Sequence, residues 1–129
     1  IIYPMHPRTQ SKLNEVSVPE GIRVMDPLGY YDFNKLTKNA FCLVSDSGTS
    51  AEEGLYYKVP CVSVRQTTER PETVEAGAHI IAGIDSQNIV DSVETIVNNK
   101  WTARYDLSVG FEPSTIVLNT LRSQITNYF

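Results

Sequence analysis

The sequence predicts an α/β fold, with an open, mostly parallel sheet and helices on both of its faces. Short apolar runs rich in β-branched residues alternate with amphipathic stretches along the chain, as they do in a series of βαβ units. Two of the runs, 41–45 and 61–65, lack the strict alternation of apolar and polar residues. That pattern is expected of strands that are covered on both faces.

Strands and helices are expected to follow one another in a Rossmann-like order. The strands are predicted at residues 1–3, 22–25, 41–45, 61–65 and 79–82, and helices near 30–38, 50–57 and 71–76. The clearest helix follows Ser86, where apolar residues lie on one helical face at Ile89, Val90, Val93, Ile96 and Val97. A last helix is predicted from Pro113 to about residue 127, because proline suits the first position of a helix. Residues 100–112 show no period and are expected to form a surface loop.

Composition limits the classes of partner. The 129 residues include 11 Lys and Arg against 15 Asp and Glu, a net charge of -4. Nucleic acid and anionic membranes both need a basic face, so neither is expected as a partner. The apolar runs are far shorter than the roughly 20 residues that span a bilayer. Cys42 and Cys61 lie in apolar runs, which favours two buried free thiols in a reducing compartment over a disulfide.

These features predict a soluble, cytoplasmic chain that forms a single domain over residues 1–129. The length fits one domain, since domains usually run to roughly 100–200 residues. The sequence opens inside a predicted strand and has no initiator methionine. We therefore expect it to be a fragment of a longer protein.

Three polar segments follow predicted strands, at residues 6–9, 46–53 and 65–72. In open α/β sheets ligands bind beyond the carboxyl ends of the strands, so these segments are the candidate binding loops. His6 lies in the first of them and is either a surface residue or a ligand contact. His79, by contrast, begins a predicted strand and is expected to be a packed residue.

The segment 46–53 has the character of a phosphate-binding turn. A turn from a buried strand into a helix leaves backbone N–H groups without partners, and the helix dipole favours an anion there. Gly48 permits close approach of the backbone, and Ser47 and Thr49 add hydroxyl donors. Alternatively, Thr49 caps the helix and Glu52 completes a capping box. The signal is weaker than a P-loop, because no Gly-Lys-Ser follows it.

Charged and aromatic residues near these loops each have two interpretations. Glu53 either accepts hydrogen bonds from a ribose diol or is a solvated residue of the first helical turns. Arg65, Glu69 and Arg70 either form an ion pair that fixes their loop or bring an arginine to a diphosphate. Phe33 lies in the predicted helix 30–38, where it either packs in the core or stacks on a base.

Three runs of residues together resemble the non-hydrolysing UDP-N-acetylglucosamine 2-epimerases, in the carboxyl-terminal half of those chains. The runs are DPLGYYDF at 26–33, DSGTSAEE at 46–53 and TERPE at 68–72. The resemblance extends from about residue 3 to residue 121. It implies the second domain of a two-domain glycosyltransferase-B type fold, with UDP held mainly by this domain.

The resemblance also implies roles for individual residues, as follows: Phe33 stacks on uracil, Ser47, Gly48 and Thr49 hold the diphosphate, Glu53 binds the ribose hydroxyls, Arg70 lies near the phosphates, and His6 contacts the sugar or a second, regulatory UDP-sugar. The implied ligands are UDP and a UDP-N-acetylhexosamine, with no cofactor and no metal. The full-length enzyme is expected to be a homodimer that supplies a precursor of cell-surface polysaccharide.

The implied reaction interconverts UDP-GlcNAc and UDP-ManNAc. UDP is eliminated across C1–C2 to give a 2-acetamidoglucal, and this step is followed by re-addition on the other face. The acid and base carboxylates are expected on the amino-terminal domain, outside this sequence, so the catalytic residues stay unassigned and the fragment alone is expected to be inactive.

The sequence departs from the family pattern at two positions. The usual loop has Gly-Gly after the serine and a Gln before the glutamate pair, whereas this chain has Thr49 and Ala51. A threonine there resembles the epimerases of the UDP-N-acetyl-L-fucosamine capsule pathway, which leaves the sugar open. Two further alternatives are a glycosyltransferase-B transferase and a non-catalytic, flavodoxin-like binding module.

Overall fold

The computed structural model describes residues 1–12, 17–99, 101 and 113–125. The chain divides into two compact units, Ile1–Phe41 and Cys42–Phe129, which we describe one at a time. A single domain over residues 1–129 therefore stays a prediction. The predicted loop at 100–112 lies outside the described residues except for Trp101, as does the end of the last helix near residue 127.

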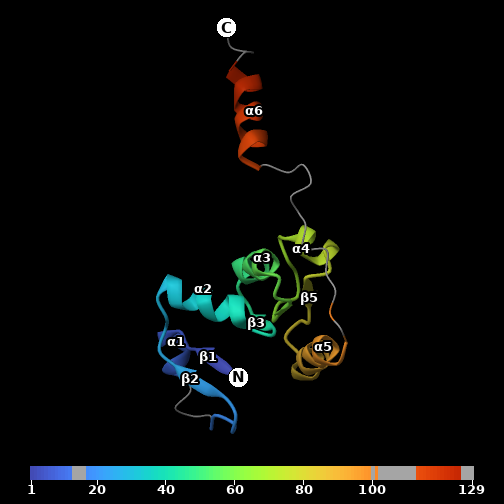
Figure 1. Ribbon diagram of the computed structural model, residues 1–129. Coiled ribbons are helices and arrows are strands. Elements are labelled where there is room, and N and C mark those ends of the chain that lie inside the picture. Colours follow the sequence, from blue (N-terminus) through green and yellow to red (C-terminus); the bar gives the residue numbers. More distant parts are fainter. Residues whose placement is uncertain (13–16, 100, 102–112, 126–129) are drawn as a thin grey trace. The chain divides into compact units, whose positions relative to one another are not determined.

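The first unit pairs two short parallel strands and carries two helices (Figure 1). Strand β1 (Ile2–Pro4) lies beside β2 (Arg23–Met25), with Tyr3 opposite Val24. Helix α2 (Tyr30–Asn39) confirms the helix predicted at 30–38. Helix α1 (Pro7–Gln10) was not predicted, because four residues are too few to show a helical period. It begins where the His6 ring accepts a hydrogen bond from the Arg8 N–H and Pro7 takes the first helical position.

The second unit contains a three-stranded parallel sheet in the order β3-β4-β5. Its elements in chain order are β3 (Leu43–Ser45), α3 (Gly48–Tyr57), β4 (Cys61–Ser63), α4 (Pro71–Glu75), β5 (His79–Ile81), α5 (Ser86–Asn98) and α6 (Pro113–Ile125). Each strand and helix predicted here is present, within a few residues of its predicted bounds. The strand hydrogen bonds form two sheets among the described residues, β1-β2 and β3-β4-β5, rather than the single sheet that the sequence suggests.

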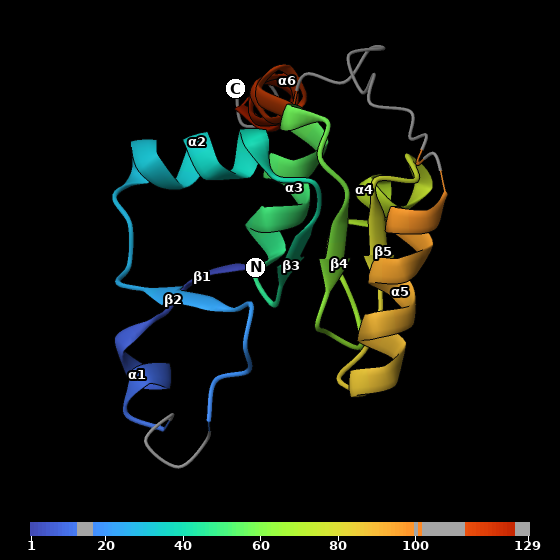
Figure 2. The same cartoon turned by 60° about the horizontal axis from the view of Figure 1, so that its bottom comes forward.

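Helices cover both faces of the β3-β4-β5 sheet, which confirms the predicted class of open parallel α/β fold. Side chains alternate between the two faces along β4. Val62 is fully buried and packs with Ile96 of α5 on one face. On the other face α3 packs against the strand through Gly54, where an added Cβ would lie 3.6 Å from the Cβ of Cys61. Figure 2 shows α3 and α5 on opposite sides of β4.

Both cysteines are free thiols, as predicted; Cys61 is fully buried, whereas Cys42 is only half-buried. Burial raises the pKa of the Cys42 thiol to about 11 and that of Cys61 to about 12. Both side chains are therefore neutral at physiological pH and pack as small apolar groups. None of the described helices has the length and apolar character that would carry it across a membrane.

Candidate functional site

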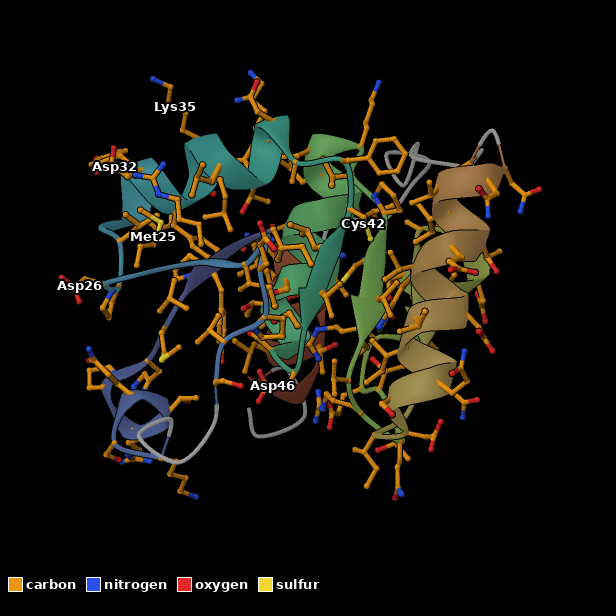
Figure 3. The ribbon with its side chains drawn as sticks, turned by 90° about the horizontal axis from the view of Figure 1, so that it is seen from below. Met25, Asp26, Asp32, Lys35, Cys42 and Asp46 are labelled. Carbon is orange, nitrogen blue, oxygen red and sulfur yellow. The ribbon has the colours of Figure 1, made fainter. Side chains whose placement is uncertain are left out.

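The candidate site is built around the amino end of α3, where β3 passes into the helix. Figure 3 shows Cys42 and Asp46 at opposite ends of β3, so Asp46 marks the carboxyl edge of the sheet. The hydroxyl of Ser45 accepts hydrogen bonds from the Ser47 N–H at 3.1 Å and from the Ser50 hydroxyl at 3.0 Å. These two bonds hold the turn between β3 and α3 to Ser45, a residue of the strand.

The helix begins at Gly48 with Ser47 as its N-cap, and no side chain caps it. The predicted capping box of Thr49 and Glu52 is therefore wrong. Ser47 already occupies the cap position because the Ser45 hydroxyl holds its N–H, and Thr49 lies inside the first turn. The helix consequently starts before the position that the capping pattern suggested.

Hydroxyl and backbone donors gather at this helix start. The Ser47 Oγ and Thr49 Oγ1 atoms are 2.9 Å apart, and both residues are exposed. The first N–H groups of a helix have no partners within it, and the helix dipole adds partial positive charge at the same end. The structure thus brings together Ser47, Gly48 and Thr49 in an arrangement that suits an anion.

An arginine from the loop that follows β4 lies against Gly48. A Cβ added at this glycine would come within 3.3 Å of the Arg65 Nη1 atom, so the missing side chain is what allows the guanidinium to lie this close. Arg65 donates from Nη1 to Glu69 Oε2 at 3.0 Å and from Nη2 to Glu69 Oε1 at 2.9 Å. The hydrogen bonds and charge of Arg65 hold the pKa of the Glu69 carboxyl below its usual range.

Arg65 is the residue of the candidate site to which the family resemblance gave no role. The sequence analysis weighed it with Glu69, but the resemblance singled out only Arg70. The available signal was its place directly after a predicted strand, at the same sheet edge as the turn before α3. Its contact with Gly48, seventeen positions earlier, depends on the fold and has no local pattern.

Arg70 meets α3 through a second ion pair. Its Nε atom donates to Glu52 Oε1, so Glu52 joins the loop to the helix instead of capping the helix. Both arginines are therefore paired with glutamates, Arg65 within the loop and Arg70 outside it, and the diphosphate interpretation stays a prediction. All four side chains remain partly exposed, and exposed ion pairs add little to stability. An incoming anion can therefore compete for either arginine.

The remaining candidate residues are placed as follows. Glu53 is half-buried and lies four residues after Thr49, which places the two on one face of α3. Phe33 and His6 belong to the first unit, where the Phe33 side chain is exposed on α2 and His6 caps α1. His79 is 4 % exposed, which confirms that it is a packed residue.

The chemistry of the cluster is that of an anion site. Two hydroxyls, unpartnered helix N–H groups and two guanidinium groups suit a phosphate or a diphosphate, which arginine binds through two parallel hydrogen bonds. Within the part of the chain that the structure describes, no three His, Cys, Asp or Glu side chains are grouped so as to hold a metal ion.

Comparison with known proteins gives a consistent set of similarities. The UDP-N-acetylglucosamine 2-epimerase family matches residues 1–109. The UDP-N-acetylglucosamine 2-epimerase of Methanococcus maripaludis is 42% identical over 109 residues, which cover 78% of this chain and 30% of the relative. The enzyme of the same name from Methanocaldococcus jannaschii is 41% identical over 106 residues, covering 78% of this chain and 29% of the relative.

A solved structure is similar over more of the chain. It is the Methanocaldococcus jannaschii UDP-GlcNAc 2-epimerase in complex with UDP-GlcNAc and UDP, with a TM-score of 0.73 and 36% identity, covering 93% of this chain and 35% of that one. The chain thus spans about a third of the length of the proteins it matches.

Proposed function

The chain belongs to the UDP-N-acetylglucosamine 2-epimerase family, and we propose that it forms the part of such an enzyme that binds UDP. The observation that carries this proposal is the amino end of α3, where exposed hydroxyls of Ser47 and Thr49 and the guanidinium of Arg65 lie at one helix start. The similar Methanocaldococcus jannaschii structure contains UDP-GlcNAc and UDP, which supports a uridine diphosphate as the anion.

The diphosphate is assigned to the first turn of α3. Ser47 and Thr49 donate through their hydroxyls, and Gly48 lets the phosphate oxygens reach the backbone N–H groups. Arg70 neutralises phosphate charge, and we add Arg65 to this set because of its contact with the glycine. Each arginine exchanges a glutamate partner for the phosphate when the ligand binds.

The nucleoside and sugar contacts are proposed at the residues that the family resemblance implies. Glu53 accepts hydrogen bonds from the two ribose hydroxyls, since it lies one helical turn beyond Thr49. Phe33 stacks on the uracil ring. His6 contacts the sugar or a second UDP-sugar that regulates the enzyme.

The full-length protein is proposed to interconvert UDP-GlcNAc and UDP-ManNAc. UDP leaves across C1–C2 of the sugar to give a 2-acetamidoglucal, and is then added back with the C2 proton delivered to the opposite face, so that C2 is inverted. This chemistry needs a positioned acid and base, worth typically 10²–10⁴-fold in rate. We assign those carboxylates to the amino-terminal part of the enzyme, so that this chain binds UDP weakly and does not turn over substrate. The enzyme is proposed to be a cytoplasmic homodimer without nucleic-acid or membrane partners.

An isotope experiment on the full-length protein tests the reaction. UDP-GlcNAc is incubated alone in deuterated water, and the C2 hydrogen is followed by NMR. An epimerase exchanges this hydrogen for deuterium, whereas a glycosyltransferase-B transferase leaves it in place. Retention of hydrogen with normal UDP binding would reassign the protein to the transferases, and absence of UDP binding would favour a non-catalytic binding module.

The identity of the sugar is a separate question. Thr49 and Ala51 stand where the usual loop has other residues, and a threonine at this position favours an epimerase of the UDP-N-acetyl-L-fucosamine pathway as the second candidate. The same exchange assay with both UDP-sugars separates these substrates.

A further inference from the structure

His79 is a buried titratable residue that the UDP site does not use directly. It begins β5, and its side chain is almost fully buried. Its Nδ1 atom lies 2.9 Å from the Oγ1 atom of Thr73 in α4. Its Nε2 atom is buried without a hydrogen-bond partner among the described residues. Among the described residues, the hydrogen bond to Thr73 is therefore the one that orients the His79 ring.

The direction of that hydrogen bond follows from the Thr73 hydroxyl. A hydroxyl carries one hydrogen, and the backbone oxygen of Arg70 can only accept. Thr73 Oγ1 lies 2.7 Å from the Arg70 oxygen, so the hydroxyl hydrogen points to Arg70. Thr73 can then only accept from the ring, which requires the hydrogen of His79 to be on Nδ1.

The neutral ring fits this arrangement and the charged ring does not. A protonated histidine would carry a second N–H at Nε2, where the described structure offers no acceptor. Burial and the nearby positive charge of Arg65 also lower the pKa of His79. The chain of bonds therefore runs from the His79 ring through the Thr73 hydroxyl to the Arg70 carbonyl oxygen.

This chain holds the backbone of Arg70 at the point where α4 begins. The Arg70 carbonyl also accepts from the Thr73 N–H at 3.1 Å, and the Arg70 N–H donates to the Thr68 hydroxyl at 3.1 Å. The N–H and the carbonyl oxygen of Arg70 are thus both hydrogen-bonded, while its side chain reaches Glu52 on α3. The position of the guanidinium depends on this backbone, because the side chain extends from a residue with little freedom to move.

We propose that His79 is a positioning residue for Arg70, acting through the Thr73 hydroxyl as the Nδ1–H tautomer, so that the arginine is held where an incoming diphosphate can take it from Glu52. This inference rests on the proposed function, since it assigns Arg70 to the phosphates. It goes beyond that function in giving the UDP site a support from β5, which contacts α4 through His79 and Thr73.

A double-mutant cycle on UDP affinity tests the proposal. We expect His79→Leu to weaken UDP binding by about three- to tenfold, the effect of one lost hydrogen bond. His79→Asn is the conservative variant, because its amide nitrogen can donate to Thr73 from the position of Nδ1, and we expect it to restore most of the affinity. In the Arg70→Ala background, His79→Leu should have no further effect. If His79 only stabilised the fold, the effects of the two substitutions on UDP affinity would instead add.

The outcomes separate this proposal from the proposed function. If Arg70→Ala weakens UDP binding but His79→Leu does not, or if the two losses add, the positioning role is wrong while the UDP site stands. If the wild-type protein does not bind UDP, both assignments fail. If it binds UDP and Arg70→Ala changes nothing, Arg70 does not contact the phosphates and the positioning role is wrong, while the UDP site stands. Should His79→Leu not fold, Thr73→Val interrupts the same chain, with Thr73→Ser as its control.

The tautomer gives a second test that needs no ligand. In ¹⁵N spectra of the wild-type chain near neutral pH, we expect the Nδ1 atom of His79 to be protonated and the Nε2 atom to be bare. Protonation at Nε2 alone would overturn the proposal, because the Thr73 hydroxyl would then have to donate to the ring and release Arg70.

Discussion

The amino end of α3 (residues 46–53) and the β4–α4 loop (residues 64–70) both follow a strand of the same sheet, yet they are held in different ways. The neutral hydroxyl of Ser45 fixes the first, by accepting from the Ser47 N–H and from the Ser50 hydroxyl. Charged pairs fix the second, in which Arg65 and Arg70 each meet a glutamate. The first region presents donors that need no rearrangement to bind an anion, whereas the second must give up an existing ion pair. Contacts made by the amino end of α3 should therefore contribute more to UDP affinity than those of the loop.

The largest expected effect is at Glu53. Glu53→Gln removes charge-assisted hydrogen bonds to the ribose, worth about 1.5–3 kcal/mol. UDP affinity should fall by roughly ten- to over a hundredfold, since each 1.4 kcal/mol is about tenfold. Calorimetric titration of UDP into the wild-type chain and the variant measures the difference.

Two glutamate variants serve as controls for that change. Glu52→Gln alters the neighbouring residue, whose carboxylate meets Arg70, and should not lower UDP affinity. Glu94→Gln makes the same chemical change at an exposed position of α5. Equal affinities of wild type and Glu53→Gln would show that Glu53 is only a helix residue and would remove the ribose assignment.

The next effect is expected at Arg65. Arg65→Ala removes a guanidinium that lies against Gly48, and should weaken UDP binding by about tenfold through the loss of one charge-assisted contact. The difference in UDP affinity between wild type and variant should shrink at high salt, because screening weakens the interactions of exposed charges. An unchanged UDP affinity would leave Arg70 as the only arginine of the site.

A change in the opposite direction is expected at Glu69. Glu69→Gln frees Arg65 from its bidentate partner, so UDP should no longer compete with a carboxylate. We expect affinity to rise by about two- to fivefold, the range that corresponds to an exposed ion pair. A fall in affinity would mean instead that Glu69 orients Arg65 for the phosphate.

The smallest effect concerns stability and pH. Arg65 lowers the pKa of the folded Glu69 carboxyl from its ordinary value of 4.5. The pair therefore stabilises the fold above that ordinary value, and the stabilisation is lost as the pH falls through the lowered pKa. Urea unfolding of wild type and Glu69→Gln along an acid series should show a slight advantage of wild type at neutral pH that disappears in acid. A constant difference at every pH would contradict the ion-pair origin.

The same contrast explains what the sequence could predict. Apolar runs and the period after Ser86 predict the strands and α5, because burial on a sheet or along one helix face leaves a local pattern. The start of α3 was predicted too late, since the Ser45 hydroxyl that holds Ser47 lies in the strand and takes no part in capping patterns. The turn residues themselves were found, because a polar Gly-containing turn after an apolar run is a local signal.

The β4–α4 loop was harder to predict for a physical reason. The Arg70–Glu52 and Arg65–Gly48 contacts join residues that are far apart in sequence and meet only when β3 and β4 pair. Local spacing suggested a capping box for Glu52, and the tertiary ion pair replaced it. Charged residues in a loop therefore indicate that a site is near, but the fold decides which of them reach it.

The most direct test of UDP binding at the amino end of α3 is an NMR titration of the ¹⁵N-labelled chain with UDP. We expect the largest amide shifts at Gly48 and Thr49, whose N–H groups belong to the first turn of α3, and at Ser47, whose hydroxyl is assigned to the diphosphate. Smaller shifts should follow at Arg65 and Arg70, whose side chains exchange partners. UDP binding that leaves the amides of 47–49 unmoved, or a chain that does not bind UDP, would contradict the assignment of the site.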